Sequence, residues 1–287
     1  IQSAAPTRID GSLIANGRVY IVNPAGVVFG NNAVVNVGRL YAAAGNISDT
    51  DFVRGIDRFT NMNGEVSNYG NLTADFVTLA GKRAANEGTI NAPQGTVVMA
   101  AGNDVMVGER TGNVFVKVGG GNPGKDGGVS NKGVVNARGG KALMAAGDMF
   151  ALALGAGSEV TAKDVTIEGQ GRGEVIVSGS IDASNQGRDG SGGTVKVLGE
   201  KVGLSGATID ASGTTGGGEV LVGGNYQGQG SERNASRTYV SPNTTIKANA
   251  TETGNGGQVV VWANEVTRFG GTIESKGGAQ AGDGGNV

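Results

Sequence analysis

The chain has 287 residues, of which 56 are glycine, 5 are proline and none is cysteine or histidine. Its 23 basic and 25 acidic residues give a net charge of −2 and form no basic stripe, which argues against a nucleic-acid-binding surface. Glycine at this level without a G-X-Y period excludes collagen, and the lack of histidine removes the commonest general base and metal ligand. The remaining small and β-branched residues favour short strands separated by glycine turns.

The first predicted strands flank the sequence NPAGVVFG at 23–30, with apolar runs at 18–22 before it and 32–45 after it. Asn-Pro favours turn initiation, and Gly26 can take the positive φ that many tight turns need. The candidate turn is therefore made of Asn23, Pro24, Ala25, Gly26 and Val27. We interpret it as a turn that shapes the fold, with direct recognition by a partner as the alternative.

Further along, residues 85–107 repeat at 130–152 with an offset of 45, and a shorter copy at 67–81 precedes them with an offset of 18. Asn68, Asn86 and Asn131 occupy the same place in the three copies. Self-similarity at a long period is typical of solenoids, because each repeat buries its apolar face on its neighbours. The three asparagines are predicted to stack their amides in a ladder at one corner.

The second half repeats a short strand, a glycine-rich loop and a second strand. The repeats begin at 180, 208, 245 and 272, and the first strand of each contains an isoleucine: Ile181, Ile209, Ile246 and Ile273. The isoleucines are spaced by 28, 37 and 27 residues, and the long interval carries a polar excursion at 225–243. These patterns predict an all-β right-handed parallel β-helix of about ten coils, with short loop or hairpin excursions. An antiparallel sandwich is the alternative fold.

Two acidic residues, Asp182 and Asp210, recur in the sequence I-D-A-S. They could form a pair of catalytic acids, as in β-helical polysaccharide hydrolases, or cap backbone N–H groups at corners. Lys247 and Glu274 occupy the same position in later repeats, so the position does not require an aspartate. We therefore favour the role of a cap at a corner over that of a catalytic acid. The sequence GGNPGKDGG at 120–128 is similar to a calcium-binding nonapeptide but is out of register, so it predicts an excursion. We expect no enzyme activity and no catalytic, cofactor or metal site.

Residues 8–48 closely resemble the amino-terminal secretion domain of filamentous-haemagglutinin-like exoproteins of two-partner secretion systems. The matching features are G-x-L-x-A-N-G-x-V-x-x-x-N-P-x-G-V-x-F-G at 11–30 and V-N-V-G-x-L at 35–40. The resemblance runs over 1–150, whereas 151–287 resembles the family's glycine-rich shaft more weakly and continues the first part. Family members often have asparagine where this chain has Ala25. The family's upstream cap and second Asn-Pro turn are absent, so we expect a partial domain in a fragment cut at both ends.

The resemblance implies an outer-membrane two-partner transporter as the partner in export, and it makes the turn at 23–27 a candidate for recognition by that transporter. It also implies a secreted or cell-surface location in a Gram-negative-type bacterium. We expect a structural exoprotein, an adhesin or a filament-forming protein. Its further partners would be a host or neighbouring-cell surface or carbohydrate, or other copies of itself in fibres. The alternatives are a β-helical polysaccharide lyase or hydrolase, and the stalk of a contact-dependent growth-inhibition toxin.

Overall fold

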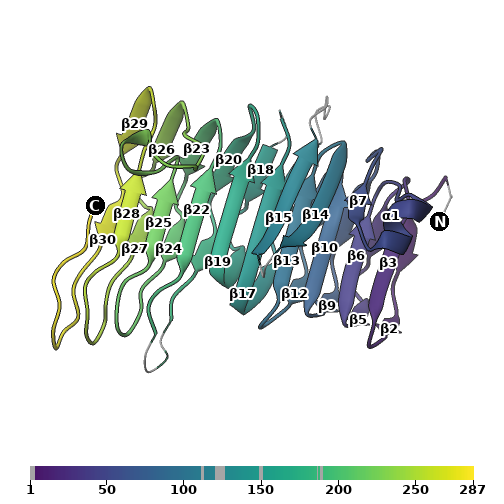
Figure 1. Ribbon diagram of the computed structural model, residues 1–287, viewed down its shortest axis with the longest axis horizontal. Coiled ribbons are helices and arrows are strands. Elements are labelled where there is room, and N and C mark those ends of the chain that lie inside the picture. Colours follow the sequence, from purple (N-terminus) through teal and green to yellow (C-terminus); the bar gives the residue numbers. More distant parts are fainter. Residues whose placement is uncertain (1–3, 111–112, 120–126, 149–150, 186, 188–189) are drawn as a thin grey trace.

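The computed structural model describes residues 4–110, 113–119, 127–148, 151–185, 187 and 190–287. Its strands lie side by side in one long stack from the N-terminal to the C-terminal end (Figure 1). Within these residues the helical elements are the short α1 (Asp49–Arg54) and η1 (Tyr226–Gly228), and no described helix is long and apolar enough to cross a membrane. The stacked strands pair in parallel, so the predicted parallel β-helix is confirmed and the antiparallel sandwich is wrong.

The first face of the β-helix is a ten-stranded parallel sheet, in agreement with about ten coils. Each strand has three or four residues, and alternate side chains point inward and outward. In spatial order its strands are β1 (Thr7–Ile9), β4 (Val27–Phe29), β8 (Glu65–Asn68), β11 (Arg83–Asn86), β16 (Gly128–Asn131), β18 (Ala151–Leu154), β20 (Glu174–Val177), β23 (Lys201–Leu204), β26 (Arg237–Val240) and β29 (Val266–Phe269).

The second and third faces form one 17-stranded sheet, because β17 (Val134–Ala146) and β19 (Glu159–Gly169) run through both. The second face also contains β2 (Ser12–Ile14), β5 (Val34–Asn36), β9 (Asn71–Thr73), β12 (Thr89–Asn91), β21 (Ser180–Asp182), β24 (Thr208–Asp210), β27 (Thr245–Lys247) and β30 (Thr272–Glu274). The third face also contains β3 (Arg18–Val22), β6 (Arg39–Ala43), β10 (Phe76–Gly81), β13 (Thr96–Ala101), β22 (Thr194–Leu198), β25 (Glu219–Val222) and β28 (Gln258–Val261).

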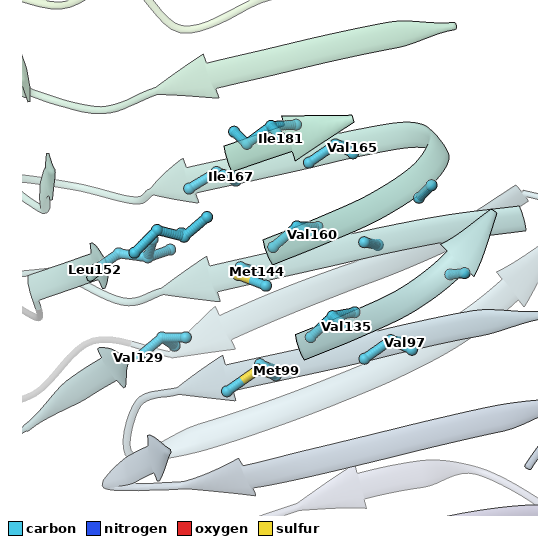
Figure 2. Packing of buried hydrophobic residues seen from close by; sticks show 14 of the residues in the cluster. Val97, Met99, Val129, Val135, Met144, Leu152, Val160, Val165, Ile167 and Ile181 are labelled. Carbon is cyan, nitrogen blue, oxygen red and sulfur yellow. The ribbon is translucent and has the colours of Figure 1, made fainter. Parts of the chain in front are cut away.

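Columns of like residues fill the interior, and their register follows the sequence repeats. The four repeat isoleucines 181, 209, 246 and 273 occupy equivalent positions on β21, β24, β27 and β30. Met99 pairs with Met144 and Met144 with Ile167, and Figure 2 shows their side chains one above another in the core. Full burial of such a side chain stabilises the fold by about 1.5–3 kcal/mol.

Both sheets continue across residue 150, where the two predicted parts meet. On the first face β16 pairs with β18, and on the other two faces β17 pairs with β19. The core columns also pass this point without interruption. The second part is thus continuous with the first, and the division at 150 itself stays a prediction.

A first excursion stands on the outer side of the third face. It consists of α1 and an antiparallel sheet of β7 (Asp57–Phe59), β14 (Asp104–Arg110) and β15 (Asn113–Gly119). Tyr41 and Phe76 from the third face pack with Phe59 and Val105 from this sheet in a second, smaller core. The β14–β15 hairpin accounts for much of the 45-residue interval between Asn86 and Asn131. The sequence at 120–126, similar to a calcium-binding motif, lies outside the described residues.

A second excursion, at 223–236, is tied to the third face by polar contacts. Lys196 Nζ lies 2.9 Å from Glu232 Oε1, Asn225 Nδ2 donates to Glu232 Oε2 at 3.1 Å, and Arg233 pairs with Glu200 at 3.1 Å. The predicted C-terminal boundary of this excursion, residue 243, is wrong, because 237–240 form β26 of the first face. Thr238 points inward there, and its hydroxyl donates to the Trp262 carbonyl at 2.7 Å, which is why a polar sequence forms a core strand.

The Glu232 contacts predict a pH-dependent term in stability. Hydrogen bonds from Lys196 and Asn225 lower the pKa of Glu232 from 4.5 to about 2. A depressed pKa in the folded state adds stability above pH 4.5 that is lost as pH falls toward 2. We expect the unfolding free energy of the unaltered chain to approach that of Glu232→Gln over this range, as measured by denaturant titration at several pH values. A difference that stays constant with pH would contradict the assignment.

Candidate functional site

The predicted turn at 23–27 is built around a fully buried asparagine. The Gly26 N–H donates to the Asn23 carbonyl at 2.9 Å, which closes the turn. The Asn23 side-chain Oδ1 accepts from the Ala25 N–H at 3.0 Å, an arrangement in which the side chain supports its own turn. Its Nδ2 donates at 3.0 Å to the Ala5 carbonyl and to the Thr7 hydroxyl, so Asn23 joins the turn to the preceding segment.

The turn is also held from the other side by the next coil. Gly26 has φ +124°, and a Cβ there would lie 2.8 Å from the Glu65 carbonyl oxygen. A Cβ on Gly64 would lie 2.7 Å from the Pro24 carbonyl oxygen. Close backbone stacking on both sides therefore leaves Pro24 and Ala25 half-buried, while Asn23, Gly26 and Val27 are buried. A partner could reach the turn through the side chains of Pro24 and Ala25 alone.

The structure brings Asn68, Asn86 and Asn131 together at one corner, fully buried. Asn68 Nδ2 donates to Asn86 Oδ1 at 2.8 Å, and Asn86 Nδ2 donates to Asn131 Oδ1 at 2.8 Å. The two ends of the row bond to backbone, since Asn68 Oδ1 accepts from the Gly70 N–H at 3.1 Å and Asn131 Nδ2 donates to the Gly133 carbonyl at 3.2 Å. Every amide thus has partners, as buried polar groups require.

The asparagine row is a polar insert in an otherwise apolar column of the first face. Phe29, at the end of β4, lies beside Asn68, and Leu154 lies beside Asn131. The turn at 23–27 leads into β4, whose last residue is Phe29 and on which β8 with the first asparagine of the row stacks. The turn therefore lies one coil before the first asparagine of the row.

The acidic residues Asp182 and Asp210 lie side by side on β21 and β24. The Oδ1 atom of each accepts the N–H two residues on, from Ser184 at 2.9 Å and from Ser212 at 2.8 Å. Asp182 also pairs with Arg138 at 3.1 Å. These contacts are those of corner caps. No group of three or more histidine, cysteine, aspartate or glutamate side chains that could hold a metal occurs among the described residues.

Sequence reasoning did not single out the aromatic row under the first excursion. The rings of Tyr20 and Tyr41 stack with centroids 4.5 Å apart, and Tyr41 stacks on Phe76 at 5.7 Å. Burial and the hydrogen bond from Tyr20 to Asp57, 2.6 Å long, raise the pKa of Tyr20, so its hydroxyl stays protonated. The signal was present in the strand sequences RVYIV and RLYAA, which place a tyrosine at the same outward position.

Comparisons with known proteins agree with this geometry. One relative is the heme/hemopexin-binding protein of Haemophilus influenzae, 36% identical over 108 residues, which cover 33% of this chain and 12% of that protein. The crystal structure of the HMW1 secretion domain from Haemophilus influenzae has the same fold, with a TM-score of 0.74 at 24% identity over 93% of this chain and 73% of that one. The family model of the TPS secretion domain matches residues 1–188, past the end of the resemblance at 150. With most of its length matched, the chain belongs to the family of TPS, or two-partner secretion, domains.

Proposed function

We propose that this chain directs the export of an adhesin or filament-forming exoprotein and forms the first part of its rod. Membership of the family implies a two-partner exoprotein of a Gram-negative system and an outer-membrane transporter as its partner. The chain spans 12% of the curated relative's length, so the activity of the whole protein belongs to this proposal. The observation that carries it is the uninterrupted parallel stack, in which each coil is the template for the next.

The stacked coils support a mechanism in which folding of the chain outside the cell drives its export. Each new coil buries apolar side chains on the previous one and pairs its backbone with it, as Val135 does on Ile90 and Val160 on Val135. Nearest-neighbour stabilisation of this kind lets a solenoid grow from one end without an external energy source. The turn at 23–27 and the asparagine row act in this process as register marks for the first coils.

A paired measurement separates a structural turn from a recognised one. We expect Ala25→Lys to leave both stability and export unchanged, because its half-buried side chain can extend into solvent. Pro24→Ala should lower the unfolding free energy by about 0.4–1 kcal/mol through unfolded-chain entropy, with export falling in proportion. The measurements are denaturant unfolding of the purified chain and secretion of the full-length protein beside its transporter. Normal stability with lost export for Ala25→Lys would make the turn a recognition site.

A binding role is better supported than an enzymatic one. Asp182 and Asp210 each use one carboxylate oxygen on a backbone N–H, and Asp182 uses the other on Arg138. The relative from Haemophilus influenzae is a heme/hemopexin-binding protein. We infer from these observations a surface protein that binds a partner, and we propose carbohydrate on another cell as the class of that partner. Two other roles are kept as alternatives within this proposal: a protein that forms filaments by self-association, and the stalk of a growth-inhibition toxin.

A further inference from the structure

The outer side of the first face carries a small grid of side chains toward the C-terminal end. The strands β20, β23, β26 and β29 lie next to one another there (Figure 1). One outward column contains Ile176, Gly203, Tyr239 and Arg268, and the neighbouring column contains Glu174, Lys201, Arg237 and Val266. The glycine is the one position in this grid without a side chain.

Gly203 is a glycine that its own backbone does not require. A Cβ there would meet Ile176 Cγ1 at 3.9 Å and the Val175 carbonyl at 4.0 Å, which are ordinary contacts, and its φ is not in the left-handed region. By contrast, a Cβ on Gly140 of β17 would lie 1.8 Å from the Gly95 carbonyl oxygen. Glycine weakens a strand, and where no turn or close packing explains it, it often marks the approach of a ligand to the backbone.

A hollow of about 650 Å³ lies over Gly203 and is lined by residues of β20, β23, β26 and β29. Its walls are Ile176 and Tyr239, each 49% exposed. The two lie on strands β20 and β26, two strand spacings or about 9.6 Å apart. Only the half of each side chain that faces the gap narrows it, so one sugar ring fits between them over Gly203.

The rim of the hollow is cationic. It is lined by Lys201, Arg237 and Arg268 and by one acid, Glu174. Lys201 is 2.6 Å from Glu174, and Arg237 is 3.6 Å from Glu265 outside the hollow. Arg268 is exposed and takes part in none of the ion pairs among the described residues. A guanidinium in this state favours an oxyanion, and a carboxylate matches it in both charge and geometry.

We propose that this hollow binds a hexuronic acid unit of an acidic polysaccharide. The C–H face of the sugar ring packs on Tyr239 above Gly203, its carboxylate pairs with Arg268, and Lys201 contacts a hydroxyl. An uncharged sugar would leave Arg268 without a partner, and a larger group at position 203 would take the place of the ring. The biological setting rests on the proposed adhesin role, whereas the binding site does not.

The test is a calorimetric titration of the purified 287-residue chain with tetragalacturonic acid, with maltotetraose as the uncharged probe. We expect binding of the acidic tetramer that is at least about tenfold tighter than that of maltotetraose. Gly203→Leu should abolish binding while the unfolding midpoint is unchanged or higher, because the site has room for a Cβ. Tyr239→Ala should also abolish it, and Arg268→Gln should weaken it by about tenfold.

The matched control is Ser130→Leu, which adds the same side chain to the same outward column two coils before Ile176. It should bind as the unaltered chain does. The proposal is overturned if tetragalacturonic acid does not bind, if maltotetraose binds equally well, or if Gly203→Leu binds normally. Adherence of cells by the full-length protein is measured in a separate assay. If that assay shows no adhesin role, the titration still decides whether the hollow binds the acidic sugar.

Discussion

Replacing Asn86 with leucine is expected to lower the free energy of unfolding by about 2–4 kcal/mol, although leucine is similar in size and more apolar. Asn86 stands in the middle of the row, accepting from Asn68 Nδ2 and donating to Asn131 Oδ1. Leucine removes both partners at once and leaves two buried amides short of a hydrogen bond. A buried polar group without its partner costs about 1–3 kcal/mol.

The triple variant Asn68→Leu, Asn86→Leu, Asn131→Leu separates pairing from size. With no side-chain amide left in the row, we expect its cost to be smaller than the sum of the three single variants. The control is Asn71→Leu on the exposed side of β9, which should change the unfolding free energy by less than about 0.5 kcal/mol. Denaturant unfolding measures all of these. An Asn86→Leu variant as stable as Asn71→Leu would show that the row contributes nothing.

Gly26→Val should be similarly damaging, for a different reason. Valine at φ +124° is strained, and its Cβ would stand 2.8 Å from the Glu65 carbonyl oxygen of the next coil. Backbone strain alone costs about 1–3 kcal/mol, and displacement of the stacked coil adds to it. We expect a loss of at least about 3 kcal/mol in the unfolding free energy, together with lost export.

The control for Gly26→Val is Gly17→Val, where a Cβ would have no atom within 4 Å and φ is not in the left-handed region. It should leave the unfolding midpoint almost unchanged. Equal effects of the two substitutions would mean that the loss at position 26 comes from the valine side chain in general and not from the turn.

The repeats predicted the architecture well because stacked coils need similar residues at equivalent positions. Residues that match at an offset of 45, such as Asn86 and Asn131, are partners on adjacent strands. The first excursion could not be predicted in this way. Its sheet pairs β7 with β14, two segments of unlike sequence that both pack on Tyr41 and Phe76. Pairing of distant, unlike segments leaves no period in a sequence.

At 23–27 the local sequence predicted the chain reversal but not which of its side chains are exposed to solvent. Asn-Pro and a following glycine suffice for chain reversal, whereas the burial of Asn23 depends on Ala5 and Thr7 before it and Glu65 after it. The same holds for Gly203. Among 56 glycines in the sequence it looks like any other, and its spare room becomes visible when its neighbours on β20 and β26 are placed.

The spacing of the coils has a mechanical consequence. From Ile181 to Ile209 the chain advances 28 residues, which would span roughly 90 Å if fully extended, yet the rod grows by about one strand spacing of 4.8 Å. The length of extended chain taken into each coil is thus roughly twenty times the length by which the rod grows. For a chain that emerges through a narrow opening, each completed coil of this length therefore takes up roughly 90 Å of extended chain.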